Sequence, residues 1–409
     1  MNKKKVYQWC KKYIVADNVR IALLFIPLTF LLVKLCASGK FSLGNYLDVS
    51  VLVSFILVFF CEGIAKALSS MIKRKCEDAT KLSEDYEKLV KKYCREDMVK
   101  HNDSVFPATC QAFRSESEPA FEYEFVHENK LVKYQLPSQI AEHSVELMGA
   151  HAYSNVYNNM NVRIDDCVMA GGKVKLAYSS TRYYDSLITN RAIDFPWSTG
   201  KTIREIYEPG PFLSPLPESR LSNHLGFNGF VELAGGEIVF VYRSNKVSIG
   251  KNTWGTSVSS SFKVKYGLNA DREMTEEGIR ETIRGEIRDE LKINLSLEDV
   301  PGSAVFAFYR DFVEGGKPQF LFYVKLPNLS REAFEENFAK VLREQREKQG
   351  VKIDGKKFEY FTRTQLSGFK YNLNGNAVID EKEYRMVPSA AVSVALLGKF
   401  FETGKDVSE

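Results

Sequence analysis

The chain has 409 residues, of which 44% are hydrophobic and 26% are charged, so it is long enough for two or three folded units and unlike a disordered polymer. Residues 1–100 hold 18 basic and 10 acidic side chains, whereas the rest of the chain holds 38 and 42. Because the basic excess lies beside apolar segments, composition argues against binding of a nucleic-acid polymer. The seven cysteines form no CxxC pair, which argues against a zinc site and a disulfide framework.

Two apolar runs, residues 21–37 and 47–68, open the chain and are joined by a short loop. A membrane-spanning helix needs about 20 mostly apolar residues, and each run approaches that length. A signal peptide is the alternative for the first run, but no small-residue cleavage site follows it. The sequence therefore predicts a two-helix transmembrane hairpin within residues 1–72. Basic residues flank its outer ends, so the positive-inside rule places both termini and the folded domain in the cytoplasm.

Four charged residues lie within or beside these runs. In an antiparallel hairpin Lys34 lies level with Asp48, and Arg20 lies level with Glu62. We expect either two ion pairs or independent snorkelling of the long side chains to the membrane surface.

Residues 73–98 predict a helical linker. Leu82, Tyr86, Leu89 and Tyr93 are spaced at i, i+4, i+7 and i+11, which forms one stripe on a helix. Two interpretations remain open, because the stripe can pair with copies of itself or rest on the folded domain.

Residues 99–409 predict a mixed-sheet α/β domain with an N-terminal extension. The Pro-rich stretch 207–218 is a connector that could divide it in two, and a hairpin turn is expected at 314–317. Expected strands are 121–126, 173–181, 229–233, 237–244, 303–312 and 320–326, and expected helices are 137–150, 274–292, 330–348 and 388–402.

The helix at 274–292 contains the most specific chemical pattern of the chain. Glu286, Asp289 and Glu290 are spaced so that all three carboxylates crowd one side of a helix. Such a cluster suits a hard cation such as Mg²⁺ held against a pyrophosphate. The alternative is a solvated acidic face with no ligand.

Residues 271–293 resemble the Nudix signature, with Glu277 at its first acid and Gly285 to Ile293 covering its end without an insertion. In that family an arginine helps to orient the carboxylates and a glycine ends the helix. Here these positions carry Gly285 and Lys292, and Asp271 replaces the first signature glycine. These departures favour a binding domain over a hydrolase. No cofactor is required on this interpretation, and Mg²⁺ is expected only if the site is a functional hydrolase.

The segments 178–195 and 220–230, with the two apolar runs and the divergent signature, resemble the SMODS-associated Nudix effectors of bacterial anti-phage (CBASS) systems. The resemblance implies a homo-oligomer of the bacterial inner membrane that binds a cyclic oligonucleotide made by a partner nucleotidyltransferase and then disrupts that membrane, causing abortive infection. A membrane-anchored, Mg²⁺-dependent Nudix hydrolase of nucleoside diphosphate derivatives is the first alternative, and a membrane adaptor is the second.

Arginine and aromatic side chains suit such a ligand, because guanidinium groups bind phosphate and aromatic faces stack on bases. The alternative is that the aromatic residues belong to the core and the arginines to the surface. The candidate contacts are Arg243, Trp254 and Arg310, followed by Arg182, Tyr184 and Tyr309.

Overall fold

The computed structural model describes residues 86–127, 133–149, 158–196, 200–243, 252–349, 356–372 and 375–402. The chain divides into two compact units, Met1–Lys81 with Gly149–Tyr153 and Leu82–Met148 with Ser154–Glu409. Apart from Gly149, the described residues all belong to the second unit. The fold of that unit is mixed α/β.

The described helices are α4 (Tyr86–Lys92), α5 (Ser138–Glu142), α6 (Ser144–Gly149), α7 (Tyr183–Leu187), η3 (Asn190–Ala192), α8 (Ile203–Tyr207), η4 (Leu216–Glu218), α9 (Val264–Gly267), α10 (Glu276–Leu291), α11 (Arg331–Gln349), α12 (Arg363–Ser367) and α13 (Pro388–Phe401). The described strands are β1 (Val99–His101), β2 (Ser104–Phe106), β3 (Ala108–Phe113), β4 (Glu122–Val126), β5 (Met160–Ala170), β6 (Lys173–Arg182), β7 (Gly226–Leu233), β8 (Glu237–Arg243), β9 (Thr253–Gly255), β10 (Val258–Ser261), β11 (Val305–Asp311), β12 (Lys317–Leu326), β13 (Phe358–Thr362), β14 (Lys370–Tyr371), β15 (Asn376–Ile379) and β16 (Lys382–Arg385).

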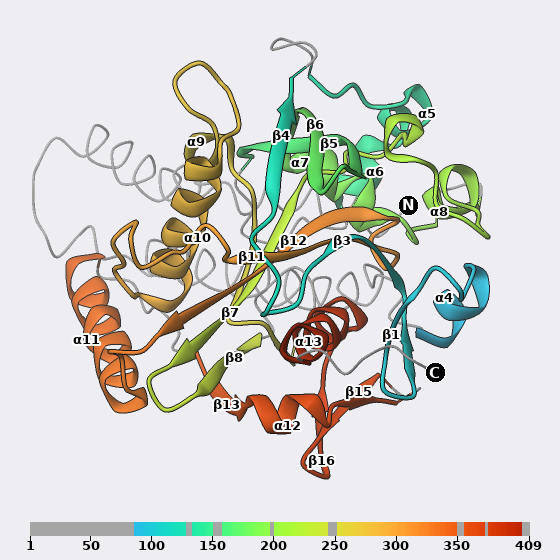
Figure 1. Cartoon of the computed structure of the whole chain (residues 1–409). Coiled ribbons are helices and arrows are strands. Elements are labelled where there is room, and N and C mark those ends of the chain that lie inside the picture. The colour runs from blue at the N-terminus through green and yellow to red at the C-terminus, as the bar shows by residue number, and fades with distance from the viewer. Residues whose placement is uncertain are drawn as a thin grey trace, which may run out of the picture. The chain divides into compact units, whose positions relative to one another are not determined.

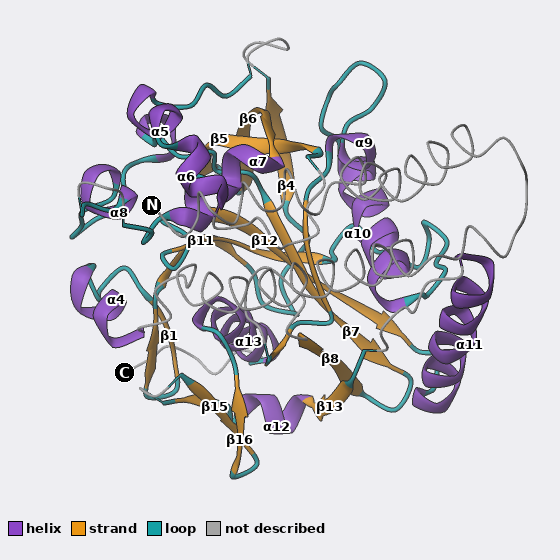
Figure 2. Ribbon diagram, turned by 180° about the vertical axis from the view of Figure 1, so that it is seen from behind, coloured by secondary structure: helices purple, strands orange, loops and turns teal. Residues whose placement is uncertain are grey.

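The largest described sheet has the strand order β13–β8–β7–β12–β11–β3, with β9 paired to β8 and β10 paired to β7 (Figure 1). Strands β7 and β12 run parallel, and β11 and β12 form an antiparallel hairpin. The predicted turn at 314–317 is therefore confirmed. The smaller sheet β4–β6–β5 continues directly into α7 and lies beside it in both views (Figure 2).

Each face of the large sheet is covered by a helix and an apolar core. On β7 the side chain of Phe230 joins the core that contains α13, and the next residue, Val231, joins the core that contains α10. This alternation follows from the two-residue period of a strand. The buried stripe of α10 includes Ile279, Ile283 and Ile287, and burial of one such side chain contributes about 1.5–3 kcal/mol. The helix that carries the acidic motif is thereby fixed against the sheet.

The described part of the linker rests on the folded domain. Leu89 and Tyr93 are buried, and the hydroxyl of Tyr93 donates to the carbonyl of Glu208 over 2.8 Å. This contact supports the second interpretation of the linker stripe for residues 86–93. The stretch 207–218, which could have divided the domain, does not divide it, because both of its flanks belong to one compact unit. The helix expected at 137–150 is two short helices separated at His143.

The predicted fold class requires a correction. No helix among the described residues is long and apolar enough to cross a membrane, so the expected fold of a Nudix-like domain preceded by a transmembrane hairpin is restated as mixed α/β. Both predicted spans, and the predicted charge pairs of Lys34 with Asp48 and of Arg20 with Glu62, lie outside the described residues. The inner-membrane localisation is corrected on the same finding, and membrane disruption forms no part of the proposals below.

Candidate functional site

The acidic helix α10 has well-defined ends. Thr275 caps its N-terminus by accepting a hydrogen bond from the backbone N–H of Gly278 over 3.0 Å. At its C-terminus Lys292 adopts the left-handed conformation, with φ of 61°, at a position where glycine is usual. The carbonyl of Lys292 accepts from the amide of Asn337 over 2.8 Å, which helps to hold the chain in that conformation. The helix therefore ends where the signature ends, without the glycine.

Gly285 replaces the signature arginine, and no steric reason requires glycine there. A Cβ atom at this position would lie 3.8 Å from the ring of Tyr266, which is an ordinary van der Waals contact. Gly278 differs, because a Cβ atom there would lie 2.3 Å from the carbonyl oxygen of Gly267. The loss of the arginine therefore removes a guanidinium group without relieving a clash.

Two of the three predicted metal ligands form ion pairs with lysines from other parts of the chain. Glu286 is only 1% exposed and accepts a hydrogen bond from Nζ of Lys263, at the N-cap of α9, over 2.6 Å. Glu290 accepts from Nζ of Lys356, which also donates to the backbone carbonyl of Glu290 over 2.9 Å. These ammonium groups neutralise the carboxylates that a metal ion would need.

The third predicted ligand, Asp289, is half-exposed and lies 3.3 Å from Nε of Arg288. The described residues contain no group of three or more His, Cys, Asp or Glu side chains placed to hold a metal ion. Binding of Mg²⁺ would require both lysines to leave their carboxylates, so the residues present do not fit a metal ion in this arrangement.

Three of the predicted ligand contacts lie in packed surroundings. Arg310 is buried and donates to the carbonyls of Gly316 over 3.0 Å and Ser214 over 2.8 Å. The hydroxyl of Tyr309 lies 3.0 Å from that of Ser393 on α13. The ring of Trp254 packs edge-on against Tyr242 and Tyr384. Tyr309 and Trp254 therefore pack in or against the core, as the alternative expected, whereas Arg310 is buried and not at the surface.

The other predicted contacts lie near α7 and α10. Arg182 is exposed at the N-cap of α7, and Tyr184 in the first turn is 37% exposed. Arg243 ends β8, and its pKa is lowered by burial and by the positive charge of Arg191, while the carboxylate of Glu290 acts in the opposite direction. The pKa of Arg243 therefore responds both to Glu290, in the last turn of α10, and to Arg191, in η3 after α7.

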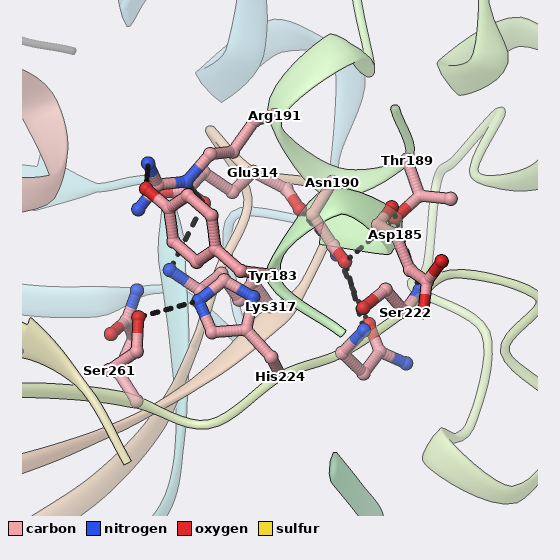
Figure 3. Close-up of polar contacts among 12 residues, drawn as sticks. Tyr183, Asp185, Thr189, Asn190, Arg191, Ser222, His224, Ser261, Glu314 and Lys317 are labelled. Atoms are coloured by element: carbon pink, nitrogen blue, oxygen red, sulfur yellow. Dashed lines mark hydrogen bonds and ion pairs between the residues drawn. The ribbon is translucent and has the colours of Figure 1, made fainter. Parts of the chain in front are cut away.

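A polar cluster formed by buried His224, Glu314 and Lys317 and half-buried Tyr183 and Arg191 was not singled out from the sequence (Figure 3). Lys317 lies 3.1 Å from the carboxylate of Glu314, and Arg191 lies 3.7 Å from the same carboxylate and donates to the hydroxyl of Tyr183 over 2.6 Å. The cluster thus joins α7, η3, the residues before β7 and the β11–β12 hairpin.

Burial perturbs the titration of this cluster. It lowers the pKa of His224 well below its usual value, and the positive charges of Lys317 and Arg191 act in the same direction. It also lowers the pKa of Lys317, although Glu314 opposes this change. Perturbed titratable groups gathered in one place are typical of functional sites. The cluster is therefore a second candidate functional site, in addition to the acidic helix α10.

A frame of neutral hydrogen bonds supports the cluster. The amide of Asn190 donates to Oδ1 of Asn223 over 3.1 Å and to the backbone carbonyl of Glu314 over 3.0 Å. The hydroxyl of Thr189 lies 3.2 Å from the backbone N–H of Ser222 and accepts from it. The polar tripeptides at 189–191 and 222–224 are the sequence signal for this frame, because they interrupt apolar segments.

Comparison of the sequence with protein-family models and with curated proteins gives no match. The chemistry of the site must therefore be argued from its own residues.

Proposed function

We propose that the described domain binds a phosphate-bearing nucleotide without hydrolysing it, and that the nucleotide is a cyclic oligonucleotide signal of the kind implied by the resemblance to SMODS-associated Nudix effectors. The observation that carries this proposal is the pairing of Glu286 with Lys263 and of Glu290 with Lys356. Two of the three acids of the motif are then neutralised by lysines of the protein itself. A sensor gains nothing from destroying its signal, and such pairing is consistent with that role.

Electrostatics explain why this pairing opposes hydrolysis. Cleavage of a pyrophosphate at a helix of this kind depends on carboxylates that hold Mg²⁺ against the phosphate. Glu286 is buried, so its charge must stay compensated, and a metal ion would have to displace the ammonium group of Lys263. Gly285 stands where the signature has arginine, so no guanidinium group from that position can replace Lys263 as the partner of Glu286. Metal binding therefore competes with a buried ion pair.

Ligand contact is supported by the exposed residues at the start of α7. Arg182 offers forked donors to a phosphate, and Tyr184 offers a partly exposed ring on which a base can stack. Arg243, near the charge of Glu290, is the next candidate. A partner nucleotidyltransferase as the source of the ligand, and ligand-driven assembly of copies of this chain, belong to the same proposal and rest on the resemblance.

The test measures turnover and binding on the purified full-length chain. We expect no Mg²⁺-dependent hydrolysis of nucleoside diphosphate derivatives, and retention of cyclic oligonucleotides detectable by mass spectrometry. Size-exclusion chromatography with light scattering should show larger assemblies after a cyclic oligonucleotide is added. Turnover that disappears in Glu286→Gln would instead establish the hydrolase, which the retained spacing of Glu286, Asp289 and Glu290 favours.

A second variant tests the role of the lysine directly. Lys263→Met removes the ammonium group from Glu286, so Mg²⁺ should raise the melting temperature of this variant but not that of the wild type. Lys265→Met is the matched control, because Lys265 is exposed and lies over the ring of Tyr266. An equal effect of Mg²⁺ on all three proteins would show that Lys263 does not compete with a metal ion.

A further inference from the structure

A buried face made of polar side chains lies where β5 meets the start of β7. Asn161 on β5 is opposite Thr181 on β6, and Arg163, two residues after Asn161, forms a bridge with His224. Paired residues and alternate residues of a strand point to the same side of a sheet, so these side chains share one face. We call this the polar face, and its members are Asn161, Thr181, Ser222, His224 and Ser261.

All members of the polar face are buried, with exposed fractions between 0 and 7%. An interior position on a strand is usually apolar, because burial of polar groups is favourable only when their hydrogen bonds are made. Some are made here: the hydroxyls of Thr181 and Ser222 lie 3.0 Å apart, and Nε2 of His224 lies 3.1 Å from the hydroxyl of Ser261.

Other hydrogen bonds of this region are not made. Among the described residues, neither amide atom of Asn161 has a partner, and the same is true of Nδ1 of His224 and of Nδ2 of the neighbouring Asn223. Three of these atoms belong to the polar face, on Asn161 and His224, and lack partners from the protein. Because nearly all buried polar groups in folded proteins are satisfied, this concentration indicates a site for a polar ligand.

The charges around the polar face indicate the sign of that ligand. Lys317 and Arg191 both act on the imidazole of His224, and both are positive. The carboxylate of Glu314 is directed to these two cations, at 3.1 Å from Lys317 and 3.7 Å from Arg191. Figure 3 shows His224 beside Lys317, with Tyr183 and Arg191 next to them. An anion beside the imidazole would therefore meet a favourable potential.

We propose that the polar face is a buried binding site for the phosphate group of a small phosphate-bearing ligand. The amide of Asn161 and the Nδ1–H of His224 donate to the phosphate oxygens, while Lys317 and Arg191 supply the positive charge. This tautomer of His224 follows if Nε2 accepts from Ser261. The carbonyl oxygen of Asn161 is left to accept from a hydroxyl or amino group of the ligand. The identification of that ligand as a nucleotide rests on the proposed function.

Asn161→Leu tests the site, because leucine has the same number and branching of side-chain heavy atoms and lacks both unpartnered polar atoms. Calorimetric titration of the full-length chain is carried out with inorganic phosphate and, separately, with a cyclic dinucleotide. We expect the variant to bind at least tenfold more weakly than the wild type. Its melting temperature without ligand should equal or exceed that of the wild type. Lys175→Gln, at an exposed ion pair with Glu124, is the control and should retain wild-type affinity.

A second measurement keeps the test decisive if Asn161→Leu does not fold. In the wild type, the imidazole NMR signals of His224, assigned with His224→Gln, should shift on addition of phosphate or of the nucleotide. If neither compound shifts these signals, the face holds only water and the site is refuted. If the nucleotide binds with unchanged affinity to Asn161→Leu, this site is wrong while the proposed function survives. If phosphate requires Asn161 and no cyclic nucleotide binds, the site stands and the proposed function fails.

Discussion

Replacement of Asp311 by asparagine should change how the free energy of unfolding depends on pH. Asp311 is fully buried at the end of β11, and its Oδ1 accepts the backbone N–H of Val313 over 2.9 Å. Burial, followed by the neighbouring carboxylate of Glu314, raises the pKa of Asp311 to about 7 from a usual value of 3.8. Between these two values the folded protein holds a proton that the unfolded chain has released.

The sign of the effect follows from that proton. A carboxyl whose folded pKa is raised destabilises the folded state as pH rises from about 4 to about 7, and the loss is complete above the folded pKa. A gap of about three pH units at about 1.4 kcal/mol per unit gives a loss of about 4 kcal/mol. Asparagine keeps the oxygen that accepts from Val313 and cannot ionise. Any loss of unfolding free energy caused by the two amide hydrogens of asparagine does not depend on pH.

The assay is urea denaturation of the full-length wild type and Asp311→Asn at several pH values from 4 to 8. The difference in unfolding free energy should grow by about 4 kcal/mol in favour of the variant over this range. Asp299→Asn is the control, because hydrogen bonds from Ser296 lower the pKa of exposed Asp299. The unfolding free energies of this variant and of the wild type should therefore change in parallel between pH 5 and 8. Parallel curves for Asp311→Asn and the wild type would refute the reasoning.

Two further predictions concern stability and use the same assay at one pH. Gly285→Ala should stabilise α10 by about 1 kcal/mol, because its Cβ has van der Waals room, whereas Gly278→Ala should destabilise it, because its Cβ would lie 2.3 Å from a carbonyl oxygen. Equal effects of the two changes would contradict the packing. Arg363→Met should cost about 3 kcal/mol by leaving buried Glu232 without its 2.8 Å partner, while Arg331→Met, at an exposed pair, should cost under about 1 kcal/mol. A cost of Arg363→Met no larger than that of the Arg331 control would show that the Glu232 pair contributes little.

Much of the local structure could be predicted from the order of residues alone. The helix expected at 274–292 is α10, Glu276–Leu291, and the strand expected at 237–244 is β8, Glu237–Arg243. Apolar spacing with periods of 3.6 and two residues is a local property, so it identifies such elements before any tertiary contact is known. The placement of Glu286, Asp289 and Glu290 on one helix follows from the same local rule.

The partners of these acids could not be predicted in this way. Glu286 meets a lysine 23 positions away and Glu290 meets one 66 positions away, and no periodic pattern relates such distant residues. Tyr309 and Arg310 looked like ligand contacts because their types suit nucleotides, yet the sheet places both in its interior.

The sequence by itself therefore determined several helices and strands, among them α10 and β8, and that one helix carries three acids on one side. Only the tertiary structure decided that two of these acids are neutralised by lysines, and that Asn161, His224 and Lys317 lie in one buried polar region. The physical reason is that secondary structure depends on neighbours along the chain, whereas charge compensation and burial depend on which distant strands the folded sheet brings together.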